Sequence, residues 1–187
     1  MDIFRNYITF SETITEDSIT SSIASGYITP PLIAGVYGFP SSTGSGVKVG
    51  IISLGGGFLQ SDLNSVFTDL YNGGSSPEVP SATAPTINLV SIDGANTTFT
   101  GSGPDQENTL DIYCIATLVP NATITLYVAP NSNQGFIDAV AKAVSDNVDV
   151  ISISWGSSEF PFTGPYSSIY AFGPFLDSVF ALSLIHI

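Results

Sequence analysis

The sequence predicts an α/β fold with a mostly parallel sheet and helices on both of its faces. Short apolar runs that are typical of buried strands alternate with longer segments of helical character. Glycine and proline residues mark the boundaries between these segments. Strands that alternate with helices at this spacing are typical of right-handed βαβ crossovers, which build parallel sheets.

The first three expected elements lie in the first 71 residues. Residues 30–37 predict a short helix that opens on two prolines, because proline is accepted in a first helical turn. The apolar run 47–54 predicts a buried strand. Three glycines, 55–57, then turn the chain into a helix over about 61–71, with Ser61 as its expected N-cap.

The rest of the chain continues the alternation, with no internal repeat. Pro120 ends the first helix of this part. The expected elements are strands over 86–92, 123–129 and 148–154 and helices over 105–118, over 135–145 and from about Tyr166. The chain therefore contains about four strands, and its 187 residues suffice for one sizeable core but not for two full domains.

The charge balance excludes whole classes of function. Sixteen Asp and Glu residues oppose three Lys and Arg residues, which gives a formal net charge of −13. Nucleic-acid binding needs a basic surface that three cations cannot build. No apolar stretch is long enough to span a bilayer, so we expect no membrane segment. The same balance suits an acidic medium, although ordinary acidic solubility explains it equally well.

Two residue counts bear on catalysis. The single cysteine, Cys114, lies in an apolar helical run and is expected to be a buried, inert thiol. The single histidine, His186, is next to last, so a Ser-His-Asp triad or a His-rich metal site is improbable. We therefore expect no metal site in this chain.

Glu107 and Asp111 are the candidate catalytic residues. They are four residues apart on a predicted helix, so both side chains project from one face. Coupled carboxylates can hold a proton and a base at acidic pH, because the pKa of one is pushed away from that of the other. Spacing alone favours a solvated acidic helix start, which the helix dipole stabilises, over a catalytic pair.

An ordered series of motifs resembles the sedolisin family of serine-carboxyl peptidases, which includes kumamolisin-like and tripeptidyl-peptidase-like members. The most specific motifs are the E-x-x-L-D-I helix and the S-I-S-W-G strand end. The similarity covers about residues 29–181. The segments that carry it are Pro30–Pro40, Leu54–Phe58, Ser61–Leu63, Glu107–Ile112, Val119–Ala122, Leu126–Pro130, Gly135–Val140 and Ile151–Gly156.

The resemblance implies a subtilisin-like fold with a Ser-Glu-Asp triad. Glu107 falls on the family's general base and Asp111 on the carboxylate that supports it. Ser154, Trp155 and Gly156 fall on the strand that pairs with the substrate backbone, although Trp155 is also explained as a core aromatic. The family's serine and oxyanion-hole aspartate fall beyond the end of this chain, so the fold is expected to be truncated and the fragment inactive. The calcium site implied by the family also falls there.

The residue types suit catalysis in acid. A glutamate base accepts a serine proton at a pH where its conjugate acid can also protonate the leaving amine. A histidine would be held in its charged form at that pH. Ser53 departs from the family, because many members carry glutamate at this position before the glycine turn. A proton network from that glutamate through Trp155 is therefore not expected.

We expect the chain to divide into three parts. Residues 1–28 are a linker or the end of a prosegment, and 29–181 are the N-terminal half of a peptidase catalytic domain. Residues 182–187 look like the translation of a sequencing adapter, and we exclude them from the fold.

We expect a monomeric, acid-acting peptidase that cleaves proteins or peptides in a secreted or acidic setting. Whether it is an endopeptidase or a tripeptidyl peptidase stays open. A second possibility is a catalytically dead relative that binds partners or has a structural role. A third is an unrelated doubly wound ligand-binding domain in which the motif matches are coincidental.

Overall fold

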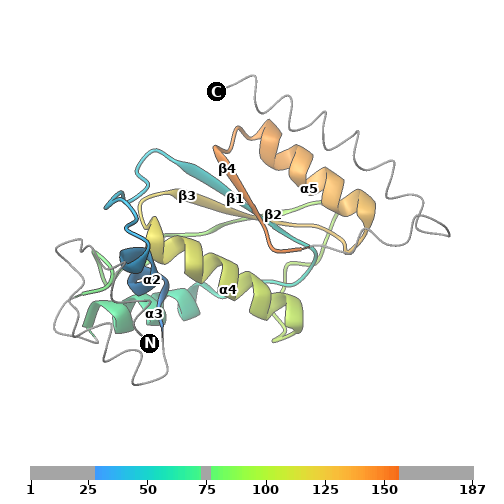
Figure 1. Cartoon of the computed structure of the whole chain (residues 1–187). Helices are drawn as coiled ribbons and strands as arrows, with labels where there is room; N and C mark the ends of the chain where they lie inside the picture. Colours follow the sequence, from blue (N-terminus) through green and yellow to red (C-terminus); the bar gives the residue numbers. More distant parts are fainter. Residues whose placement is uncertain (1–27, 73–76, 156–187) are drawn as a thin grey trace, which may run out of the picture. The chain divides into compact units, whose positions relative to one another are not determined.

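The computed structural model describes residues 28–72 and 77–155 (Figure 1). In chain order its elements are α2 (Pro30–Val36), β1 (Lys48–Ser53), α3 (Gln60–Asn72), β2 (Asn88–Ser91), α4 (Gly103–Leu118), β3 (Thr123–Val128), α5 (Asn133–Ser145) and β4 (Val150–Ile153). The alternation of strands and helices confirms the α/β class.

The chain forms two compact units. We call the first the sheet unit; its described residues are 48–58, 88–108 and 125–155. We call the second the helical unit; its described residues are 28–47, 59–72, 77–87 and 109–124. Helix α4 begins in the sheet unit and continues into the helical unit.

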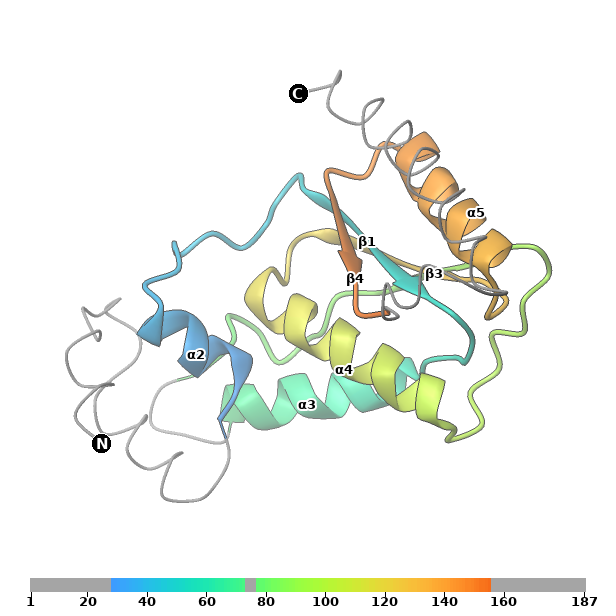
Figure 2. The same ribbon diagram turned by 45° about the vertical axis from the view of Figure 1, so that its right-hand side comes forward.

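The four strands form one sheet in the order β2-β3-β1-β4. Strand β1 pairs in parallel with β4, with Ile52 opposite Ile153, and β2 pairs in parallel with β3. Figure 2 shows β1 and β4 lying side by side. Because the strands are parallel, their carboxyl ends lie at one edge of the sheet, where α/β proteins build their sites. The parallel pairing agrees with the mostly parallel sheet of about four strands that the sequence predicts.

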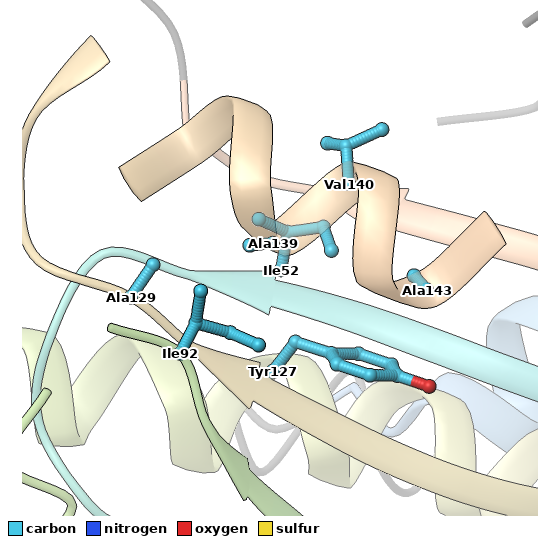
Figure 3. Packing of buried hydrophobic residues seen from close by; sticks show 7 residues of the cluster. All are labelled: Ile52, Ile92, Tyr127, Ala129, Ala139, Val140 and Ala143. Atoms are coloured by element: carbon cyan, nitrogen blue, oxygen red, sulfur yellow. The ribbon is translucent and has the colours of Figure 1, made fainter. Parts of the chain in front are cut away.

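Helix α5 packs against one face of the sheet (Figure 3). Small side chains on α5, Ala139 and Ala143, lie against Ile52 of β1 and Tyr127 of β3, and all four are at most 1% exposed. Alanines allow the helix to approach the strands closely, so that the larger side chains of the sheet fill the space between them. The N-terminus of α5 is capped by Ser132, whose hydroxyl accepts a hydrogen bond from the N–H of Gly135.

The start of α2 is joined by hydrogen bonds to a distant segment of the helical unit. Thr29 caps this helix, because its hydroxyl oxygen lies 3.4 Å from the N–H of Leu32 and accepts from it. The same hydroxyl donates to the carboxylate of Glu78, whose own N–H donates to the carbonyl of Leu70 near the end of α3. Two segments far apart in the sequence are thereby joined within this unit.

Most expected elements are confirmed, with shifts of a few residues at their ends. The prediction that Ser61 caps its helix is wrong: α3 already begins at Gln60, and the side chain of Gln60 is held by Pro85 and Ile87. Strands β2 and β4 are shorter than expected, with four residues each, and both lie at an edge of the described sheet. The helix expected from Tyr166 and the segments 1–27 and 182–187 lie outside the described residues.

Candidate active site

A tight turn follows β1 and forms one side of the candidate site. Ser53 ends the strand fully buried, and its hydroxyl donates to the carbonyl of Gly55 at 2.9 Å. Gly55 and Gly56 have φ angles of 119° and 75°, which side chains rarely allow, so both positions require glycine. Ser53 stands where the resemblance implies glutamate in many members of the family, and here its hydroxyl binds the turn itself.

Asp105, in the first turn of α4, is fully buried and accepts a cluster of hydrogen bonds. Its Oδ1 accepts from the N–H of Gly57. Its Oδ2 accepts from the N–H and the hydroxyl of Thr100, at 2.8 and 3.0 Å, and from those of Ser102, at 2.7 and 2.9 Å. Burial alone raises the pKa of Asp105, but these donors outweigh it and hold the pKa far below its usual value.

Asn108, one turn further along α4, is also fully buried. Its Nδ2 group donates to the carbonyls of Gly55 and Gly57, each at 3.1 Å. Asp105 and Asn108 together therefore bind both the N–H and the carbonyl groups of the glycine turn. The start of α4 is fastened to the carboxyl end of β1.

Glu107 and Asp111 lie one turn apart on α4, as the spacing predicts. Glu107 is partly exposed, whereas Asp111 is only 9% exposed. The charge of Asp111 reaches the neighbouring Cys114, whose pKa is raised first by burial and then by this carboxylate. One carboxylate is thus accessible from solvent and the next is enclosed, which suits a reacting base and a supporting group.

Ser154 and Trp155 follow directly after β4. The register of β1 with β4 places Ser154 one step beyond the last pair, level with Ser53. Ser154 is exposed, and Trp155 is partly buried, with its indole N–H enclosed and without a hydrogen-bond partner among the described residues. Gly156, the third residue of the expected substrate strand, lies outside the described part of the chain.

The sheet unit brings part of the predicted site together. The turn of α4 that carries Glu107 is bound to the glycine turn after β1, and Ser154 and Trp155 follow the neighbouring strand at the same edge. A partly exposed carboxylate beside a strand end can accept a proton from a group that attacks a bound peptide. Asp111 belongs to the helical unit, and its relation to Glu107 is fixed by the helix alone.

Sequence reasoning missed Asp105 and Asn108. A signal for Asp105 was available, because Ser102-Gly103-Pro104-Asp105 fits the capping-box pattern, in which the acidic side chain returns to the N–H of the first residue. No sequence signal identifies Asn108, because its two partners lie more than 50 residues earlier.

Other features of the described residues bear on metal, membrane and ligand binding. Within 28–72 and 77–155 no group of three or more His, Cys, Asp or Glu side chains could hold a metal ion. Among the described helices none is both long and apolar enough to cross a membrane. A hollow of about 510 Å³ in the helical unit has one carboxylate in its lining, Glu78, which is already bonded to Thr29.

Comparison with known proteins assigns the chain to a family. No family model matches the sequence. A curated relative does: kumamolisin from Bacillus sp. (strain MN-32) is 40% identical over 146 residues, which are 75% of this chain and 25% of kumamolisin. The chain belongs to the sedolisin family. It spans about a quarter of the length of the curated relative it matches and corresponds to part of a sedolisin catalytic domain.

A solved structure supports the fold independently. Pseudomonas sedolisin, a serine-carboxyl proteinase complexed with two molecules of pseudo-iodotyrostatin, superposes with a TM-score of 0.50 at 22% identity. The match covers 83% of this chain and 40% of the Pseudomonas chain. At this identity the match establishes that the two chains share a fold, and the function must be argued from the residues of the site.

Proposed function

We propose that this sedolisin chain forms part of the catalytic domain of an acid-acting serine-carboxyl peptidase, with Glu107 as the general base and Asp111 as its supporting carboxylate. The observation that carries the proposal is the placement of Glu107. It lies on a helical turn that is bound to the glycine turn after β1, at the edge where the parallel strands end. Kumamolisin, at 40% identity, supports the family's type of chemistry.

In this proposal the longer protein supplies a serine whose hydroxyl proton passes to Glu107. The protonated glutamate then returns the proton to the leaving amine, so the residue acts first as base and then as acid. Asp111, one turn away and 9% exposed, holds the Glu107 carboxyl in place and stabilises its protonated form. A carboxyl pair can perform both steps only in acid, which sets the pH range of the activity.

Ser154, Trp155 and Gly156 form the proposed contact with the peptide backbone. β4 is an edge strand of the described sheet, so a peptide can pair along the residues that follow it. The substrate is therefore a protein or peptide in extended conformation. Cleavage by endopeptidase or by tripeptidyl-peptidase action fits this edge equally well.

The 187-residue chain alone should not hydrolyse peptides, because its proposed residues supply the base and not the nucleophile. We assign the nucleophile, the oxyanion donor and the calcium site implied by the family to the longer protein. That protein is proposed to act as a monomer in a secreted or acidic setting.

The test is a substitution in the longer protein. Glu107→Gln keeps the shape of the side chain but removes the base, so kcat at acidic pH should fall by about 10²–10⁴-fold. Asp69→Asn is the matched control, because Asp69 is an exposed carboxylate on α3 and should leave kcat unchanged. Full activity of Glu107→Gln at its own pH optimum would remove Glu107 from catalysis. A folded wild-type protein that cleaves no peptide in acid would favour the catalytically dead relative instead.

A further inference from the structure

Glu107 lies on α4 between two buried polar residues. Asp105 and Asn108 are both 0% exposed, whereas Glu107 between them is partly exposed. The two buried side chains make all the contacts described above between α4 and the glycine turn. The candidate base is therefore carried on a segment that is anchored on both sides of it.

The anchors use different groups of the same turn. The N–H of Gly57 donates to Asp105, and the carbonyls of Gly55 and Gly57 accept from Asn108. Asp105 can serve five donors because a carboxylate only accepts hydrogen bonds; the NH₂ group of an asparagine there would face N–H groups. The residue types at the two positions are therefore not interchangeable.

The packing around the turn leaves no room for a side chain at Gly56 or Gly57. A Cβ atom on Gly57 would lie 2.4 Å from both the N of Phe99 and the carbonyl oxygen of Thr97. A Cβ atom on Gly56 would lie 2.8 Å from the N of Asp105. Backbone atoms of these three segments thus lie close together, and no side chain fits between the turn and the segments around it.

We propose that Asp105 and Asn108 are positioning residues for Glu107, which hold the first turns of α4 against the glycine turn so that the Glu107 carboxylate keeps a single position relative to the strand ends. The proposal rests on the proposed function of Glu107. A general base works only within hydrogen-bond reach of the proton it removes, and a displacement of about 1 Å can cost about 10²-fold in rate.

The electrostatics of Asp105 agree with this role in an acidic medium. The hydrogen bonds from Gly57, Thr100 and Ser102 keep its pKa low in spite of burial, so the carboxylate stays ionised where ordinary carboxylates become protonated. The contacts that position Glu107 therefore survive under the conditions in which Glu107 is proposed to work.

The first test measures the anchors in this chain and does not depend on activity. In the wild-type chain the amides of Gly57, Thr100 and Ser102 should exchange slowly with D₂O. Asp105→Asn should accelerate exchange at all three amides by more than about tenfold. Asn108→Ala, which leaves Asp105 in place, should accelerate exchange at Gly57 with little change at Thr100 and Ser102. Fast exchange of the three amides in the wild type, or no change in either folded variant, would overturn the proposal.

The second test measures positioning in the longer protein. Asp105→Asn and Asn108→Ala should each lower kcat by at least about tenfold while KM changes by less than about twofold, with kcat expressed per folded molecule. A merely structural role would lower the folded fraction and leave kcat per folded molecule unchanged, and that result would overturn the proposal. Asp69→Asn is again the control.

The two proposals fail in different ways. If Glu107→Gln abolishes cleavage while both anchor variants keep wild-type kcat, the positioning role is wrong and the function stands. If Glu107→Gln is fully active, the proposed function fails, and with it any positioning role in catalysis. The exchange experiment then decides only whether the two anchors hold the turn.

Discussion

The carboxylate of Asp105 accepts a hydrogen bond from the backbone N–H of Gly57, 48 residues earlier in the chain. The bond joins the start of α4 to the turn that follows β1, and both groups are buried. A buried carboxylate is costly unless it is hydrogen-bonded, and an unpaired buried N–H is costly as well. Asp105 therefore provides the acceptor that the buried Gly57 N–H needs, and the bond stabilises the start of α4 against the glycine turn.

We predict that Gly57→Ala destabilises the protein by about 1–3 kcal/mol or more, because overpacking forces neighbouring atoms to move. The added methyl group would meet backbone atoms of Thr97 and Phe99, which cannot move as a flexible side chain can. The free energy of unfolding from denaturant titration measures this loss.

Gly103→Ala is the matched control for Gly57→Ala. A Cβ atom at Gly103 has nothing within 4 Å, and its φ is not in the left-handed region. Gly103 opens α4, and alanine is the better helix former, so this variant should be as stable as the wild type or slightly more stable. Equal stability of both alanine variants would contradict the close packing of the glycine turn.

Much of the fold could be predicted from the sequence because its strands are apolar runs bounded by glycine or proline. β1 and β3 lie in the middle of the described sheet, and their expected bounds differ from the observed ones by at most one residue at each end. The edge strands β2 and β4 are harder to predict, since an apolar residue such as Val150 can continue the pattern while it is 54% exposed.

The candidate site could be predicted only in part. Glu107 and Asp111 could be predicted because their spacing and the family motif both lie within one short segment of the sequence. Asn108 is different, because its role is set by two carbonyl groups in another segment, and only the fold brings them within 3.1 Å. Ser61 failed as a cap for a related reason: contacts of Gln60 with residues after α3 allow the helix to begin earlier.

A second prediction concerns Tyr127, whose hydroxyl donates to Asp146 at 2.9 Å from a side chain that is 1% exposed. Tyr127→Phe removes this donor and should lower the free energy of unfolding at neutral pH by about 0.5–1.5 kcal/mol. It should also raise the pKa of Asp146, which is lowered first by Lys142 and then by this hydroxyl. An Asp146 pKa in Tyr127→Phe equal to that of the wild type would show that the bond does not form in solution.

Asp146 itself gives a third prediction, on the pH dependence of stability. Its native pKa lies below the unfolded value, so the folded state binds fewer protons and the carboxylate stabilises the protein above the unfolded pKa. Asp146→Asn should therefore be less stable than the wild type at neutral pH. The difference should shrink as the pH falls through the native pKa, and a difference that is constant with pH would contradict the assignment.

Asp93 should show the opposite dependence. Although Asp93 is exposed, its pKa is raised, first by partial loss of hydration and then by the charge and the hydrogen bond of Asp138, so the folded state binds more protons than the unfolded state. The stabilising contribution is present below the unfolded pKa of about 3.8 and is lost as the pH rises through the native pKa. Asp93→Asn keeps a residue type that tolerates the φ of 52° at this position.

The stability of Asp93→Asn relative to the wild type should therefore increase from acidic to neutral pH. Thermal unfolding of both proteins at a series of pH values measures it, with Asp69→Asn as the control for loss of one surface charge. If the two variants follow the same pH dependence, Asp93 and Asp138 do not interact in the folded protein.

The last prediction uses Cys114 to report the charge of Asp111. The pKa of the thiol is raised by burial and then by the Asp111 carboxylate, which lies three residues earlier on α4. Asp111→Asn removes the charge and should lower the thiol pKa, so that the pH profile of alkylation by iodoacetamide moves to lower pH. Greater accessibility would instead raise the rate at every pH without moving the midpoint, so the profile separates the two causes.

Asp62→Asn, on α3, is the control and should leave the alkylation profile of Cys114 unchanged. A midpoint that stays in place in Asp111→Asn would mean that Asp111 carries no charge near the thiol, and the proposed support of Glu107 by an ionised Asp111 would lose its basis.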